Sequence, residues 1–222
     1  MDESLEIALP GHGRVTLSRV RLPDDFLVWQ SQARLGMFKA MEEHGDTAVR
    51  TAPAHLPVLA SMGDSVFPIN LATRGIGVLP RKEELTEFTN KFKEARANVD
   101  RSRFHESLAK RVKIAREFYS RPEIFDPNIL GGLEIFEGKT SKNLKKNPTA
   151  SLLYTGEAPR FPSYQLNGVI EFVEKENPHF EFLLAARELF AFDHFHVTQK
   201  RYPYGYLFHV VEVKNKTPFP RK

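Results

Sequence analysis

The segment from Gly132 to Val173 is the most informative about the fold, and it reads GLEIFEGKTSKNLKKNPTASLLYTGEAPRFPSYQLNGVIEFV. It holds two apolar, β-rich runs, Ala150–Tyr154 and Tyr164–Val173, joined by a connection that contains two prolines. Strand-like runs on either side of a loop are typical of an antiparallel pair. These runs therefore predict two neighbouring strands of one sheet.

A short polar segment precedes this pair. Gly138–Leu144 lies between an expected strand, Leu133–Phe136, and an expected single helical turn. The dipeptide Asn147-Pro148 ends that turn, because the residue before a proline is disfavoured in the α region. The predicted order is thus a strand, a basic turn that carries hydroxyl groups, a short helix, and two long strands separated by a loop.

Outward from this stretch, hydrophobic periodicity predicts a mixture of helices and strands. Alternation on either side of Pro10–Gly13 predicts a β-hairpin over residues 4–9 and 14–20. Helical spacing predicts a helix over 25–43, a helical hairpin over 81–120 with Asp100 as an N-cap, and a helix over 178–191. Further strands are expected at Asp64–Leu71, Arg74–Leu79 and Tyr204–Val213. We expect one domain, 1–222, in which residues 124–214 form the main β segment.

The composition narrows the class of protein. Of the 222 residues, 41% are hydrophobic and 27% are charged, which is typical of a soluble globular protein. No run of about 18 apolar residues is present, so no transmembrane helix is expected. The absence of cysteine excludes disulfides, thiolate metal sites and cysteine nucleophiles. The N-terminal residues lack a basic-then-apolar signal pattern, and we expect a cytoplasmic protein.

The charge gives little support to nucleic-acid binding. The formal net charge is +4 and the sequence pI is about 9.2, a modest excess that also suits a site for an anionic small molecule. In the expected helical hairpin, acidic residues interrupt the basic ones, whereas a nucleic-acid binder usually gathers its basic residues on one face. A pair of helices packed on a sheet, with its charges in water, is the favoured interpretation.

The basic turn is the strongest candidate for chemistry. Lys139, Thr140, Ser141 and Lys142 place cations and hydroxyl groups at a junction between a strand and a helix. A phosphate dianion needs such donors, and a helix N-terminus adds partial positive charge. The alternative is a solvated, lysine-rich turn without a ligand.

The order of these motifs resembles the FMN-binding split β-barrel of the pyridoxamine-phosphate-oxidase-like superfamily. The resemblance rests on Lys139–Lys142, Leu144, Asn147-Pro148, Ala150–Tyr154 and Tyr164–Gly168, and it covers the C-terminal two-fifths of the chain. It implies an α+β fold, a split β-barrel with the helical hairpin as an insertion and the N-terminal helix packed around it. It also implies a homodimer with the cofactor, FMN, at the subunit interface.

The resemblance further implies an FMN-dependent oxidoreductase that acts on a small-molecule substrate. The phosphate grip would fall on Lys139, Thr140, Ser141 and Lys142, and Arg74 would contribute from an earlier strand. Gln165 would contact the edge of the flavin ring. The residues identify neither a catalytic acid or base nor a substrate.

Histidines support an alternative. His194 and His196 lie two residues apart, so in a strand they would share a face, and His209 could join them from the last strand. Imidazole nitrogens bind haem iron, and some split-barrel relatives bind haem, so a haem-binding or haem-degrading protein stays open. A third possibility is a non-enzymatic scaffold or a nucleic-acid-associated module that keeps the barrel without a cofactor.

Overall fold

The computed structural model describes residues 4–45, 54–97, 99, 101–157, 159–193 and 199–219. Its strands are β1 (Ser4–Leu9), β2 (Gly13–Ser18), β3 (Val58–Met62), β4 (Ile69–Thr73), β5 (Gly77–Pro80), β6 (Phe125–Leu133), β7 (Thr149–Thr155), β8 (Ser163–Val173) and β9 (Gly205–Asn215). Its α-helices are α1 (Asp24–His44), α2 (Lys82–Arg96), α3 (Leu108–Tyr119), α4 (Lys139–Lys146) and α5 (Pro178–Glu188). Short 3-10 helices span Arg101–Ser107 and Pro122–Ile124.

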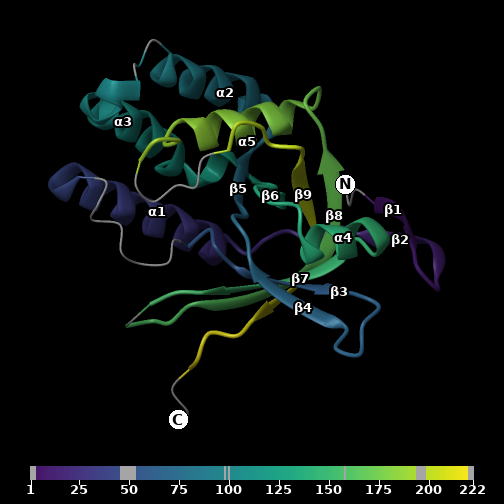
Figure 1. Cartoon of the computed structure of the whole chain (residues 1–222). Coiled ribbons are helices and arrows are strands. Elements are labelled where there is room, and N and C mark those ends of the chain that lie inside the picture. The colour runs from purple at the N-terminus through teal and green to yellow at the C-terminus, as the bar shows by residue number, and fades with distance from the viewer. Residues whose placement is uncertain are drawn as a thin grey trace.

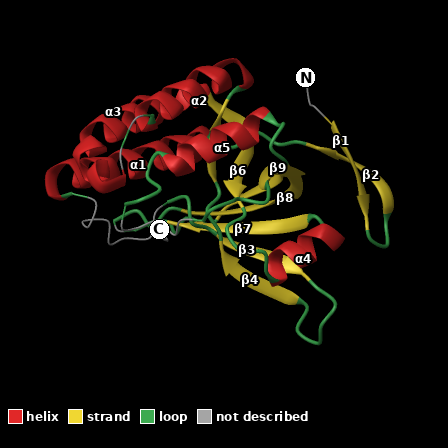
Figure 2. Ribbon diagram, turned by 45° about the horizontal axis from the view of Figure 1, so that its top comes forward, coloured by secondary structure: helices red, strands yellow, loops and turns green. Residues whose placement is uncertain are grey.

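Seven strands form one antiparallel sheet in the order β4-β3-β7-β8-β9-β6-β5. Helices α1, α2, α3 and α5 gather on one side of this curved sheet, whereas α4 lies apart beside β3 and β4 (Figure 1). The two-stranded hairpin of β1 and β2 projects away from the helical layer (Figure 2). The expected α+β class is confirmed, and the strand arrangement is consistent with a split barrel.

The two strands that the sequence predicted most clearly lie near the middle of the sheet. β7 and β8 pair antiparallel in one continuous register, from Thr149 opposite Val169 to Thr155 opposite Ser163. Their alternating inward residues meet α1, where the rings of Trp29 and Tyr164 stack at 5.9 Å between centroids. This alternation is the reason that the pair could be found from sequence, because one face of each strand is buried.

Both expected helical regions outside the barrel segment are present. The helix over 25–43 is α1, and the helical hairpin over 81–120 is α2, a 3-10 helix and α3, inserted between β5 and β6. Aromatic side chains of α2, α3 and α5 form one cluster, with Phe88 5.1 Å from Phe118 and Phe182 5.6 Å from Phe118. The proposed N-cap, Asp100, lies outside the described residues.

Three expected strands have different bounds. Of the strand expected over 64–71, residues 64–68 form the turn before β4, which a hydrogen bond of 2.8 Å from the backbone N of Gly63 to the backbone O of Pro68 closes. The strand expected from Arg74 begins only at Gly77. The strand expected over 133–136 is instead β6, which ends at Leu133 opposite Gly205 of β9.

One buried ion pair fastens the helical layer. Arg111 of α3 is fully buried, and its guanidinium donates to both carboxylate oxygens of Asp193 at 2.6 and 3.1 Å. It also donates to the backbone oxygens of Leu189 and Phe104, and to the hydroxyl of Ser107. All of the guanidinium nitrogens are thus engaged, and the pair joins α3 to the segment that follows α5.

We expect Arg111→Met to destabilise the protein by about 3–5 kcal/mol, because the buried Asp193 carboxylate then loses its countercharge. Urea unfolding followed by circular dichroism measures this change in the free energy of unfolding. Arg116→Met is the matched control, since Arg116 lies on the same helix in an exposed pair with Glu42 and should change stability by less than about 1 kcal/mol. Equal effects of the two substitutions would contradict this account of the helical layer.

Candidate functional site

The predicted basic turn is the first turn of a helix. Helix α4 begins at Lys139, and the hydroxyl of Ser141 accepts a hydrogen bond from the backbone N of Gly138 at 3.0 Å. A side chain in the first turn that bonds back to the preceding backbone N–H stabilises a helix start. The expected stop is confirmed, because α4 ends at Lys146, directly before Asn147-Pro148. The sequence therefore identified this element but underestimated its length.

The four candidate residues of α4 divide into two faces. Lys139 and Lys142 are exposed, whereas Thr140 and Ser141 are buried. The hydroxyl oxygen of Thr140 accepts a hydrogen bond of 3.0 Å from the side-chain amide of Asn70, on β4. The buried face thus attaches α4 to the sheet, and the exposed lysines flank it on the solvent side.

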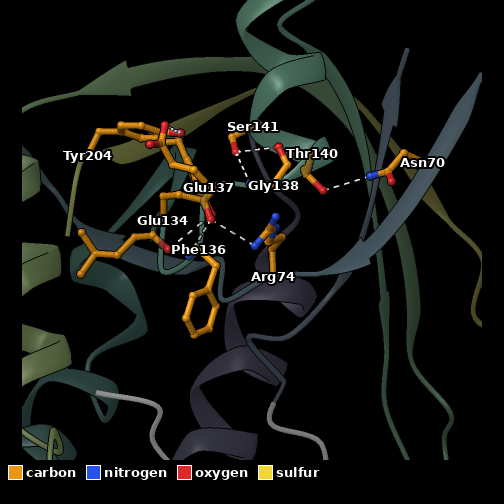
Figure 3. A network of polar contacts seen from close by, with 11 residues as sticks. Asn70, Arg74, Glu134, Phe136, Glu137, Gly138, Thr140, Ser141 and Tyr204 are labelled. Atoms are coloured by element: carbon orange, nitrogen blue, oxygen red, sulfur yellow. Dashed lines mark hydrogen bonds and ion pairs between the residues drawn. The ribbon is translucent and has the colours of Figure 1, made fainter. Parts of the chain in front are cut away.

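Arg74 joins this region from the end of β4. Its Nη1 lies 3.2 Å from Oε1 of Glu134, and the side chain of Glu134 is only 1% exposed. Figure 3 shows the pair beside the start of α4, near Thr140 and Ser141. The Nε of Arg74 is buried and has no hydrogen-bond acceptor among the described residues. A guanidinium N–H in that state can bind the oxygen of an incoming anion.

The environment of Glu134 perturbs its ionisation. Burial raises the pKa of Glu134 above its ordinary value of 4.5, while Arg74, the backbone N–H of Phe136 and the Ser141 hydroxyl act in the opposite direction. The backbone N–H of Phe136 donates to the same carboxylate oxygen, Oε1, at 3.2 Å. This carboxylate is therefore held by several donors at a place that water barely reaches.

A second carboxylate, Glu137, lies nearby and is more exposed than Glu134. Glu137 accepts hydrogen bonds from the Tyr204 hydroxyl at 3.0 Å and from the Lys145 ammonium at 2.8 Å. Hydrogen bonding to Lys145 and then to Tyr204 lowers the pKa of Glu137. Glu137 is therefore an ionised carboxylate with a lysine partner, in contrast to the desolvated Glu134.

The structure does not bring Gln165 to the start of α4. Gln165 lies opposite Leu153 of β7, which in turn lies opposite Val58 of β3, so the three side chains share one face of the sheet. Ser61, which accepts a hydrogen bond from Asn143 of α4, points to the other face. Within one chain, the predicted ring contact and the predicted phosphate grip are therefore on opposite faces.

The face that carries Gln165 also has a hollow of about 580 Å³. Its walls come from the N-terminal hairpin and from strands β3, β4, β7, β8 and β9, and they are mainly apolar. Asn167 is on its border, and the amide of Gln165 donates to Asn167 Oδ1 at 3.2 Å. Gln165 itself does not line this hollow but is bonded to a residue that does.

The histidine alternative is only partly described. His194 and His196 lie outside the described residues. His209, on β9, has a side chain that is 6% exposed, and its Nε2 is 2.7 Å from Oε2 of Glu171. The remaining ring nitrogen, Nδ1, is buried, so binding of haem iron by His209 would require this packing to open. Among the described residues, no three His, Asp or Glu side chains gather as a metal site.

Sequence reasoning missed Glu134, Asn70 and Tyr204. Glu134 lies inside the run 133–136, whose apolar residues predict a strand, and a charged residue within such a run is the signal that points to it. Asn70 and Tyr204 carried no such signal, because their part in the site depends on the pairing of β3 with β4 and of β6 with β9.

Comparisons with known proteins give distant likenesses. No protein-family model matches the chain, and no curated protein does. Among solved structures the chain is similar to HupZ of Group A Streptococcus, with 12% identity and a TM-score of 0.41, over 82% of this chain and 91% of that chain.

Two further similar structures come from other bacteria. A putative pyridoxamine 5′-phosphate oxidase from Listeria innocua has 11% identity and a TM-score of 0.40, over 82% of this chain and 97% of that chain. An FMN-binding protein from Syntrophomonas wolfei subsp. wolfei has 9% identity and a TM-score of 0.41, over 88% and 95%. Likenesses at this distance carry no argument about chemistry, which rests on the residues described above.

We expect the stability difference between the wild type and Glu134→Gln to depend on pH. Because the pKa of Glu134 is raised in the folded protein, its stabilising contribution is present below 4.5 and is lost as the pH rises through the folded-state pKa. The free energy of unfolding of the wild type minus that of the variant should therefore fall between pH 4 and pH 7. Urea unfolding over this range measures it, and a flat or rising difference would be contrary to the environment described for Glu134.

Proposed function

We propose that the chain binds flavin mononucleotide and acts as an oxidoreductase of the split-barrel type. The proposal rests on Arg74, which lies beside the first turn of α4 (Figure 3). The Nε of Arg74 is buried and has no hydrogen-bond acceptor among the described residues. A phosphate group supplies acceptors of the required charge, and a guanidinium binds such oxygens in a fixed geometry.

The residues present fit a phosphate group in three respects. Lys139 and Lys142 are exposed cations beside the helix start, and Thr140 and Ser141 bring hydroxyl groups there. The first backbone N–H groups of α4 have no partner within the helix and point toward its N-terminal end. A bound flavin would supply hydride or electron transfer, while the chain binds and orients its phosphate.

Exposed cations and the guanidinium should differ in their contributions. We expect Lys139→Ala to weaken FMN binding about threefold, since an exposed charge is screened by water. We expect Arg74→Lys to weaken it about tenfold or more, because lysine keeps the charge opposite Glu134 but loses the fork of the guanidinium. Isothermal titration of the purified protein with FMN measures both changes.

Lys146→Ala is the matched control, because Lys146 is exposed at the opposite end of α4 and pairs with Asp64. It should leave the affinity for FMN unchanged. Failure of the wild-type protein to bind FMN at millimolar concentration would refute the flavin proposal. Equal losses of FMN affinity for Lys139→Ala and Lys146→Ala would show that the start of α4 does not bind the phosphate.

We also propose that two copies of the chain associate through the outer face of the sheet. Apolar side chains are exposed there on neighbouring strands, namely Leu71 at 65%, Ile69 at 60%, Met62 at 46% and Leu153 at 41%. Contiguous apolar surface of this kind marks interaction sites on folded proteins. The same face carries Gln165, so association would bring a second chain next to the residue proposed to contact the flavin ring.

We expect Leu71→Glu to convert a dimer into a monomer, because a carboxylate in an apolar interface loses its hydration without a partner. Light scattering coupled to gel filtration gives the mass of each species. Val28→Glu is the control, since Val28 is exposed on α1, within the helical layer. A wild-type protein that is monomeric at all concentrations tested would rule out this association.

A further inference from the structure

An internal carboxylate already binds the donors at the start of α4. The Oε1 atom of Glu134 accepts from Arg74 Nη1 and from the backbone N–H of Phe136, each at 3.2 Å. The hydroxyl of Ser141, which donates to the backbone O of Gly138 at 3.2 Å, lowers the pKa of this carboxylate. A guanidinium and a backbone N–H that bind an oxygen anion, with a hydroxyl nearby, are the groups that phosphate sites use. The side chain of Glu134 therefore occupies part of this donor set, next to the Arg74 Nε to which the proposed function assigns a ligand oxygen.

Two anions do not share these donors at low cost. The Glu134 side chain is 1% exposed, and like charges that are close together in a poorly solvated place disfavour each other's ionised form. A carboxylate displaced from Arg74 but still buried to this degree is poorly hydrated, which disfavours its charged form. Protonation removes the conflict, because a carboxylic acid carries no charge and can donate a hydrogen bond to an anion.

We propose that Glu134 is an internal substitute for the ligand anion, and that a phosphate-bearing ligand binds with uptake of one proton by Glu134. The proposal rests on the proposed function for the identity of the ligand, FMN, but the anion site itself can be tested with inorganic phosphate. The ligand displaces Glu134 Oε1 from Arg74, and the proton comes from solvent.

Other groups that face Glu134 do not account for such an uptake. Arginine side chains are not deprotonated in folded proteins. Hydrogen bonding to Lys145 lowers the pKa of Glu137, which thus keeps its charge. Burial raises the pKa of Tyr204, and it raises that of Tyr206 further, so both phenols stay neutral between pH 7 and pH 9. Burial also raises the pKa of Glu134 itself, which makes it the group closest to accepting a proton.

The experiment measures the affinity for FMN and for inorganic phosphate between pH 7 and pH 9, where a phosphate monoester, with a second pKa of about 6, is already a dianion. Titration in buffers of different ionisation enthalpy counts the protons taken up. For the wild type we expect uptake of about one proton and a loss of affinity of roughly tenfold per pH unit. In Glu134→Gln we expect no proton uptake, little pH dependence, and an affinity at pH 8 at least about tenfold higher.

Glu137→Gln is the matched control, because it removes a carboxylate from the same connection without touching Arg74, and it should keep the wild-type proton uptake. If the wild type binds either ligand without proton uptake, the inference is wrong, and this holds even if Glu134→Gln does not fold. If the wild type and a folded Glu134→Gln both fail to bind phosphate and FMN, the anion site and the flavin proposal are both wrong.

The two proposals fail separately in the remaining cases. If phosphate binds with proton uptake but FMN does not bind, the internal carboxylate is supported and the flavin proposal is wrong. If FMN binds with equal affinity to the wild type and to Glu134→Gln, with no pH dependence, the flavin proposal stands and the role of Glu134 is overturned.

Discussion

A buried carboxylate, Glu134, faces the guanidinium of Arg74 beside the start of α4. Glu134 follows directly after β6, and Arg74 follows directly after β4. Their contact at 3.2 Å therefore links the ends of two strands that are not neighbours in the sheet. A buried ion pair contributes little net stability on its own, because desolvation of both charges offsets their attraction. We therefore assign this pair a role in anion binding rather than in stability.

How far the sequence could predict this structure depended on how local the signal was. The paired strands β7 and β8 were visible because one face alternates toward the core, and α4 was visible from its hydroxyl-bearing start and its Asn-Pro end. The turn between β3 and β4 was misread as a strand, because exposed apolar residues such as Val66 and Phe67 imitate a buried run. Local composition does not report which apolar residues reach the core.

The candidate site shows the same division between local and long-range information. Thr140, Ser141 and Arg74 were found because their residue types suit a phosphate, and the structure brings them to one junction. Gly168 belongs to the quoted motif for a different reason, since a Cβ there would lie 2.1 Å from the backbone O of His209, where the register of β8 and β9 shifts. Glu134 was missed, because its position opposite Arg74 follows from pairings between strands far apart in sequence.

A crystal structure of Glu134→Gln soaked with inorganic phosphate tests directly whether Arg74 and the start of α4 bind an anion. We expect a phosphate oxygen within about 3 Å of Arg74 Nε, next to the first turn of α4. An empty position there, with the introduced side-chain amide still bonded to Arg74 and phosphate absent or bound elsewhere, would contradict it.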